Sequence, residues 1–170
     1  MIQFLKSLFG GARRPAGGEA SETDGSEITF PLAHVAIQPA RGWLIFRANL
    51  TQKETDTQIC EPTLMGRFGS ITTLLFPGDG LAPAQQADAF IARSTGTLVE
   101  RKELHSRSGI PLVCVTLKEK LKNHDLDALS VCCFFSNPKG RVAMICFAGE
   151  PATALRTGEM IVQTIRFPSA

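Results

Sequence analysis

The stretch "LSVCCFFSNPKGRVAMICFAG", residues 129–149, decides the fold of this chain. Two apolar segments flank the polar sequence "NPKG" at 137–140, in which the proline fixes φ. Gly140 suits the left-handed backbone conformation that follows a type I turn. The two segments are therefore predicted to form a tight antiparallel hairpin.

The register of this hairpin places three of the chain's five cysteines. With Asn137 opposite Arg141, Cys132 lies opposite Cys146, while Cys133 points to the other face of the sheet. Adjacent cysteines on opposite faces lack the geometry with which a Cys-x-x-Cys turn binds one metal ion. We therefore expect no metal site and no cofactor at the hairpin.

Both faces of the two hairpin strands are apolar, which indicates that both faces are covered. Helices before and after the strands are available to cover them, so the predicted fold class is α+β: an antiparallel sheet flanked by helices on both faces, an α/β/α sandwich. The cysteines are expected to behave as small buried hydrophobic residues. The alternative is a cross-strand disulfide between Cys132 and Cys146.

The rest of the chain reads as short strands, one helix, a four-stranded meander and a closing helix. Turn residues separate the meander strands, which predicts antiparallel neighbours. The predicted strands cover 28–30, 35–38, 42–47, 57–66, 70–76, 96–107, 110–122, 127–137 and 140–149, and the helices cover 83–94 and 150–167. Residues at helical spacing mark one side of each helix: Ala87, Phe90, Ile91 and Ser94 in the first, and Ala154, Leu155, Met160, Ile161 and Ile165 in the second.

Composition divides the chain into three parts: a short amphipathic helix at 1–9, a flexible linker at 10–27 rich in Gly, Ala and Ser, and a single α+β domain at 28–170. Helical spacing gathers Ile2, Leu5, Leu8 and Phe9 on one side of the first segment. That helix either packs loosely on its own domain or docks on a partner or a membrane surface.

Charge and hydropathy limit the classes of partner. The net charge is +2, without a long basic run, which does not favour nucleic acid as a partner. No apolar stretch reaches the roughly 20 residues that a spanning helix needs, and Lys6 interrupts the only apolar run near the start. We therefore expect no export signal, no membrane span and a cytoplasmic protein.

Candidate catalytic chemistry is sparse. His34, His105 and His124 are scattered and fit no metal-binding or nucleophile motif, so we expect no enzymatic activity. The charged sequence "VERKELHSR" at 99–107 is typical of an edge strand protected by charge. The same edge could present a partner-binding surface through Arg101, Lys102 and Arg107.

An alternative is a small-molecule-binding protein or hydrolase with a pocket between sheet and helix. Trp43, Arg101, Glu103 and His105 are the polar or aromatic groups from which such a pocket would be built.

The order of the segments "FPLAHVAIQPARGW", "PAQQADAFIARS", "VCCFFSNPKGRVAMICFAG" and "ALRTGEMIVQTIRFP" resembles the PsbP-like α/β/α sandwich. That architecture is shared by the PsbP protein of photosystem II, a Ran-binding import factor, DcrB-type lipoproteins and chaperones of type VI secretion effectors. The resemblance covers about residues 28–168 and implies a protein that binds other proteins without catalysis. Because the chain shows neither a lipobox nor a transit segment, the resemblance implies a cytoplasmic adaptor or chaperone.

Overall fold

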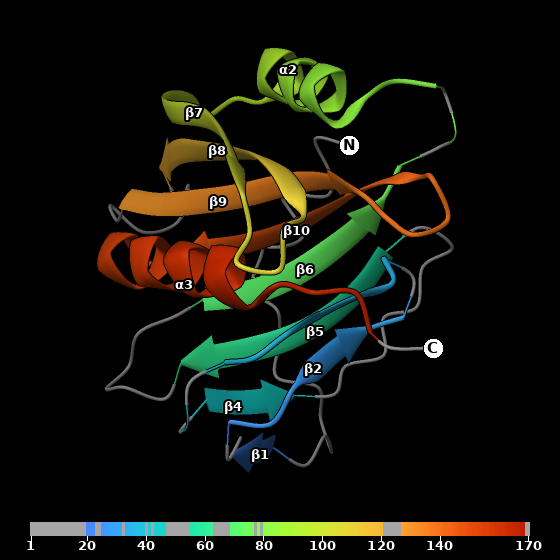
Figure 1. Cartoon of the computed structure of the whole chain (residues 1–170). Helices are drawn as coiled ribbons and strands as arrows, with labels where there is room; N and C mark the ends of the chain where they lie inside the picture. Colours follow the sequence, from blue (N-terminus) through green and yellow to red (C-terminus); the bar gives the residue numbers. More distant parts are fainter. Residues whose placement is uncertain are drawn as a thin grey trace.

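The computed structural model describes residues 20–22, 25–31, 33–39, 41, 43–46, 55–62, 69–76, 78, 80–120 and 127–168. These residues form two helices, an eight-stranded antiparallel sheet and a separate two-stranded sheet (Figure 1). The order in the large sheet is β1 (Ala20–Glu22), β4 (Trp43–Phe46), β5 (Thr55–Pro62), β6 (Gly69–Leu75), β10 (Val142–Gly149), β9 (Asp127–Ser136), β8 (Pro111–Lys120) and β7 (Thr97–His105). The small sheet pairs β2 (Ile28–Phe30) with β3 (Val35–Ile37), and the helices are α2 (Pro83–Arg93) and α3 (Pro151–Thr164).

The predicted hairpin is confirmed in its turn and in its register. Asn137 N donates to the Arg141 carbonyl at 2.8 Å, and Cys132 pairs with Cys146. The Asn137 side chain accepts from two backbone N–H groups of the turn, those of residues 139 and 141, and Gly140 has φ 73°. Glycine is favoured at this position because it has no Cβ and adopts the left-handed conformation without steric cost.

Strands β7, β8, β9 and β10 are neighbours in the sheet in chain order, which confirms the predicted meander. Strands β9 and β10 are buried on both faces apart from the two end residues of β9. The α+β class is therefore established.

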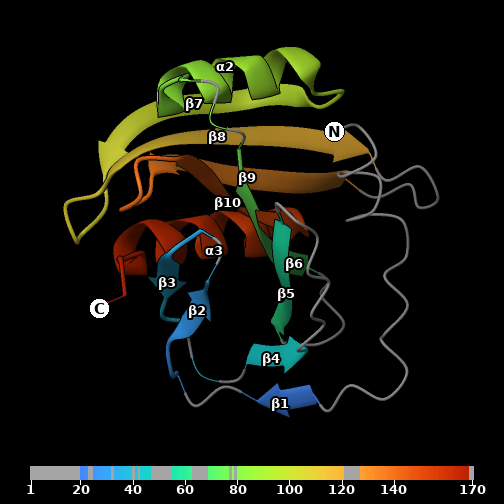
Figure 2. The same ribbon diagram turned by 90° about the vertical axis from the view of Figure 1, so that its right-hand side faces the viewer.

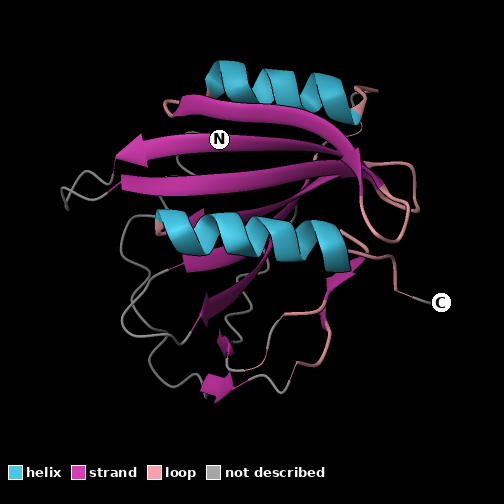
Figure 3. Ribbon diagram, turned by 60° about the vertical axis from the view of Figure 1, so that its left-hand side comes forward, coloured by secondary structure: helices cyan, strands magenta, loops and turns pink. Residues whose placement is uncertain are grey.

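Two separate hydrophobic clusters lie on the two faces of the meander. One contains Cys133 and Phe135 of β9 together with Ala154 and Ile161 of α3. The β2–β3 hairpin also belongs to this cluster, and an isolated bridge joins Ala36 to the segment after α3. The alternate residues of the same strands belong to the other cluster, together with α2. Figure 3 shows the two helices in cyan, with strands of the sheet between them in this view.

Helix α2 begins with proline at its first turn and buries Ala87 and Phe90 as predicted. The Gln85 side chain accepts a hydrogen bond from Ala82 N at 2.9 Å, which satisfies one of the free N–H groups at the helix start. Ile91 is half-buried, and Ser94 lies just past the helix end. Phe90 packs edge-on against Phe134 of β9 with the ring centroids 5.5 Å apart.

Helix α3 buries Ala154 and Ile161 as predicted, but Leu155 is 53% exposed. Leu155 follows Ala154 directly and so lies about 100° further round the helix, away from the sheet. Gly158 takes a place on the buried face instead, because the helix approaches Val131 closely there.

One strand lies before residue 28, where the domain is predicted to begin. Residues 20–22, assigned to a flexible linker by composition, form β1 and pair with β4. A short strand that is held in place by pairing with its neighbour does not need a periodic apolar pattern in its own sequence. The amphipathic segment 1–9 lies outside the described residues.

Candidate interaction surface

Strand β7 ends the large sheet and pairs with β8 alone among the strands that the structure describes. Its residues are exposed or half-buried throughout. The predicted edge strand is therefore present, and its outer side is open within the described part of the chain.

The hydrogen-bonding pattern shows which backbone groups point outward from β7. Ser106 N donates to the Ile110 carbonyl at 2.9 Å, which closes the β7–β8 hairpin. Hydrogen-bonded and non-hydrogen-bonded pairs alternate along an antiparallel ladder. The backbone N–H and C=O groups of Arg101, Glu103 and His105 therefore point away from β8, toward the open edge.

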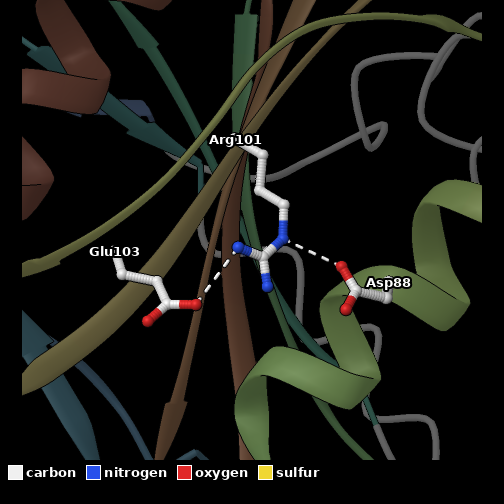
Figure 4. A network of polar contacts seen from close by, with 3 residues as sticks. All are labelled: Asp88, Arg101 and Glu103. Carbon is white, nitrogen blue, oxygen red and sulfur yellow. Dashed lines mark hydrogen bonds and ion pairs between the residues drawn. The ribbon is translucent and has the colours of Figure 1, made fainter.

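Arg101 joins the edge strand to helix α2 (Figure 4). Its Nε donates to Asp88 Oδ1 at 2.8 Å, and one terminal nitrogen donates to Glu103 Oε1 at 3.1 Å. The hydrogen bond to Glu103 contributes most to raising the pKa of Arg101, and the bond to Asp88 acts in the same direction. The Arg101 side chain is only 28% exposed, whereas both carboxylates are more than half exposed. The contact restrains β7 against α2 and leaves two acidic groups facing outward.

Lys102 lies on the opposite face of β7. Its Nζ is 3.0 Å from Glu100 Oε2, and this contact raises the pKa of Lys102. In the ladder Lys102 lies opposite Cys114 of β8, on the side covered by α3. Arg107 is exposed in the turn after β7, where its backbone N–H approaches the Val162 carbonyl at 3.4 Å.

The three predicted basic residues do not form one patch. Arg101 lies on the α2 side, Lys102 on the α3 side and Arg107 in the turn. The separation follows from the strand period of two, which sends neighbouring side chains to opposite faces. A surface that uses all three must therefore wrap around the edge of the sheet.

The apolar part of this edge, Leu98 and Val99, is not predicted from the sequence. Leu98 is 44% exposed and Val99 is 57% exposed, next to a register shift between Leu98 and Glu100. Apolar residues at the start of a strand look like core in the sequence, and a bulge that turns one of them outward has no clear signature. The edge thus carries an apolar end and a charged end.

We define the edge surface as Leu98, Val99, Glu100, Arg101 and Glu103.

The residues named for a small-molecule pocket are not brought together. Trp43 belongs to β4, and five strands separate β4 from β7 in the sheet. With neighbouring strands about 4.8 Å apart, the two lie at opposite ends of the molecule (Figure 2). Arg101, Glu103 and His105 share β7, so a pocket built from all four residues is excluded.

The remaining predicted residues and metal ligands can be placed briefly. Ile2, Leu5, Leu8 and Phe9 lie outside the described residues. Among the positions that are described, no group of three or more His, Cys, Asp and Glu residues is arranged to hold a metal ion. Neither helix α2 nor α3, nor any other helix in the described ranges, is long and apolar enough to cross a bilayer.

Comparisons with known proteins relate the chain to a solved structure of similar fold. No protein-family model and no curated protein matches the sequence. Among solved structures, the crystal structure of PA94 from Pseudomonas aeruginosa, a protein of unknown function, matches with a TM-score of 0.51 and 14% sequence identity. The match covers 86% of this chain and 99% of PA94. The chain is therefore similar to PA94 in fold.

Proposed function

We propose that this protein is a non-enzymatic protein-binding module, a cytoplasmic adaptor or chaperone, that binds an extended segment of its partner along the edge surface of β7. The observation that carries the proposal is the edge of β7, which no described strand covers and where backbone groups of Arg101 and Glu103 point outward next to exposed Leu98 and Val99. An added strand would pair with these groups, and its side chains would meet the apolar and charged ends of the surface.

Rigidity of the edge supports this proposal. The bond from Arg101 to Asp88 restrains β7 against helix α2, so a binding segment meets a strand that is already ordered. A preorganised surface lowers the entropic cost of association.

The proposed fold family also fits this role. We infer that the chain is a PsbP-like α/β/α sandwich, supported by the two hydrophobic clusters that contain α2 and α3 respectively. In that architecture protein binding without catalysis is the common mode of action. The similarity to PA94 concerns the fold and adds no function.

The test is a substitution that blocks the edge without breaking the sheet. In Glu103→Pro the missing N–H is one that points away from β8, so the β7–β8 ladder keeps its bonds. Glu103→Thr is the matched control, because it removes the same carboxylate and keeps the N–H. Circular dichroism and thermal unfolding should show that both variants fold.

A photo-reactive residue at position 99 then reports binding in a lysate of the source cells, with the same probe at exposed position 155 as a control. The proposal expects a discrete cross-linked protein from position 99 that is lost in Glu103→Pro and retained in Glu103→Thr. Equal cross-linking from position 155, or cross-linking that persists in Glu103→Pro, would contradict it. A chain lacking residues 1–19, which keeps β1, tests whether the predicted helix at 1–9 contributes.

A further inference from the structure

The meander contains two cross-strand pairs of thiols on its two faces. Cys132 and Cys146 pair between β9 and β10, as the sequence predicts, and Cys114 and Cys133 pair between β8 and β9. In each pair the two Sγ atoms are 2.9 Å apart, and all four side chains are buried free thiols. The pair of Cys114 and Cys133 belongs to the cluster with α3, and the other pair belongs to the cluster with α2.

Both pairs occupy positions where a disulfide fits the backbone. The bond from Asn137 N to the Arg141 carbonyl fixes the alternation along β9 and β10, so Cys132 and Cys146 form a non-hydrogen-bonded pair. The same alternation makes Cys133 and Cys114 a non-hydrogen-bonded pair on the other side of β9. Such pairs bring Cα atoms to about 4.5 Å, within the range that a disulfide spans.

The two pairs differ in how deeply the sheet encloses them. Cys114 is on β8, and β7 is the one strand of the described sheet that lies beyond it. No residue of β7 is buried, and β7 pairs with β8 alone among the described strands, so fewer contacts must break to reach Cys114 than to reach Cys132 or Cys146. Cys132 and Cys146 lie between β8 and β6, so several strands must separate before they are reached.

The charges near the two pairs differ as well. Lys102 lies opposite Cys114 in the ladder, with Glu100 as its partner. The hydrogen bond with Cys133 lowers the pKa of the Cys114 thiol, and the positive charge of Lys102 lowers it further, while burial and the negative charge of Glu100 oppose this change. The pKa values of Cys133, in the same pair, and of Cys132, in the other pair, are both raised by the bond to the partner thiol and by burial. Since the thiolate is the nucleophile, Cys114 is the favoured site of attack.

We propose that Cys114 and Cys133 form an oxidation-sensitive dithiol that closes to a disulfide in the folded protein when it meets hydrogen peroxide. The Cys114 thiolate attacks one peroxide oxygen, the O–O bond breaks, and hydroxide leaves and is protonated to water. Cys133 then attacks the sulfur of the Cys114 sulfenic acid, the S–O bond breaks, and a second water leaves. Two thiols and one peroxide thus become one disulfide and two waters.

The disulfide would tie β8 to β9 at a point one strand away from the edge surface. It is a covalent restraint on the part of the sheet that carries β7, independent of whether a partner binds there. Reduction by a thiol would restore the starting state.

The test follows disulfide formation in the folded full-length chain. Protein treated with graded hydrogen peroxide is quenched, denatured in N-ethylmaleimide and digested without reduction, and the linked peptides are quantified by mass spectrometry. We expect the Cys114–Cys133 link to form at least tenfold faster than the Cys132–Cys146 link. Equal rates, or sulfinic and sulfonic acids on Cys114 without a link, would overturn the proposal.

Variants assign the steps. Cys133→Ser should leave a sulfenic acid on Cys114 that dimedone captures, whereas Cys146→Ser should leave the Cys114–Cys133 link unchanged. Lys102→Gln, at an exposed position that folding tolerates, should slow the link several-fold, and Lys118→Gln on β8 is its matched control. An unchanged rate in Lys102→Gln, or loss of the link in Cys146→Ser, would contradict the assigned roles.

Discussion

Strands β7 and β10 belong to the same antiparallel sheet, yet every residue of β10 is buried and none of β7 is. β10 has a strand on each side and a hydrophobic cluster on each face. β7 has one neighbour among the described strands and, on its α2 face, an ion pair with Asp88.

The contrast distinguishes two roles within one sheet, stability through packing and contact with other molecules. Residues of β10 contribute to stability through packing, because each removed side chain leaves a cavity. Residues of β7 contribute little to stability and are available for contact with other molecules. The following predictions test how sharply the two roles divide.

The largest effect is expected at the centre of the sheet. Phe147→Ala in β10 should lower the free energy of unfolding by about 3–5 kcal/mol, because Phe147 is fully buried. Val99→Ala in β7 should change it by less than about 0.5 kcal/mol. Urea denaturation of both variants measures the difference, and comparable losses would remove the distinction between the two strands.

A second prediction concerns the close approach of α3 to β9. A Cβ at position 158 would lie 2.7 Å from Cγ1 of Val131, so Gly158→Ala should destabilise the protein by about 1–3 kcal/mol despite the higher helix propensity of alanine. In a Val131→Ala background the same change should be neutral or stabilising by up to about 1 kcal/mol.

A double-mutant cycle by denaturant unfolding checks this reversal. If Gly158→Ala costs the same in both backgrounds, contact with Val131 is not the reason for glycine in the helix.

A smaller effect is expected where β7 meets α2. Arg101→Met should cost less than about 1 kcal/mol, since both carboxylate partners are largely exposed. The cost should fall as salt is added, because salt screens exposed charges. Unfolding at low and high ionic strength measures it, with Lys118→Met as the control at another surface pair. A cost that does not depend on salt would point to packing by the arginine stem instead.

The smallest effect concerns Glu119 near the end of β8. Burial raises its pKa, and its Oε1 has no hydrogen-bond partner among the described residues. The folded state therefore binds the proton more tightly than the unfolded state, so this group favours folding below pH 4.5 and the contribution is lost as the pH rises through the raised folded pKa.

Glu119→Gln should thus stabilise the protein slightly at pH 7 and leave it unchanged near pH 4. Thermal unfolding at the two pH values tests this, with Glu103→Gln, an exposed glutamate on β7, as the control. A loss of stability at pH 7 would mean that the carboxylate is favourably bound.

Local pattern predicted the hairpin and the meander, because a strand period of two and a fixed turn leave one register. The pairing of Cys132 with Cys146 followed by counting from the turn at 137–140. The pairing of Cys114 with Cys133 could not be counted in the same way, because the sequence between the two strands does not specify a turn type and so leaves their register open. Likewise, nothing local indicated that β6 pairs with β10 or that residues 20–22 pair with β4.

Of the candidate surface, the sequence predicted the charged edge but not its apolar end. A run of alternating charges excludes a buried strand, whereas Leu98 and Val99 are compatible with either environment. Their exposure depends on the register shift beside them and on β7 being the last strand, and both are properties of the assembled sheet.

The pairing of β6 with β10 also sets when this molecule becomes complete during its synthesis. Leu75 pairs with Ala143 and Gly69 pairs with Gly149. The centre of the sheet can therefore form only after β10 has been synthesised and has left the ribosome. Contacts between such distant segments slow folding, and the apolar strands stay open to aggregation in the meantime. Nascent chains that end before residue 142 should therefore depend on cellular chaperones for their solubility.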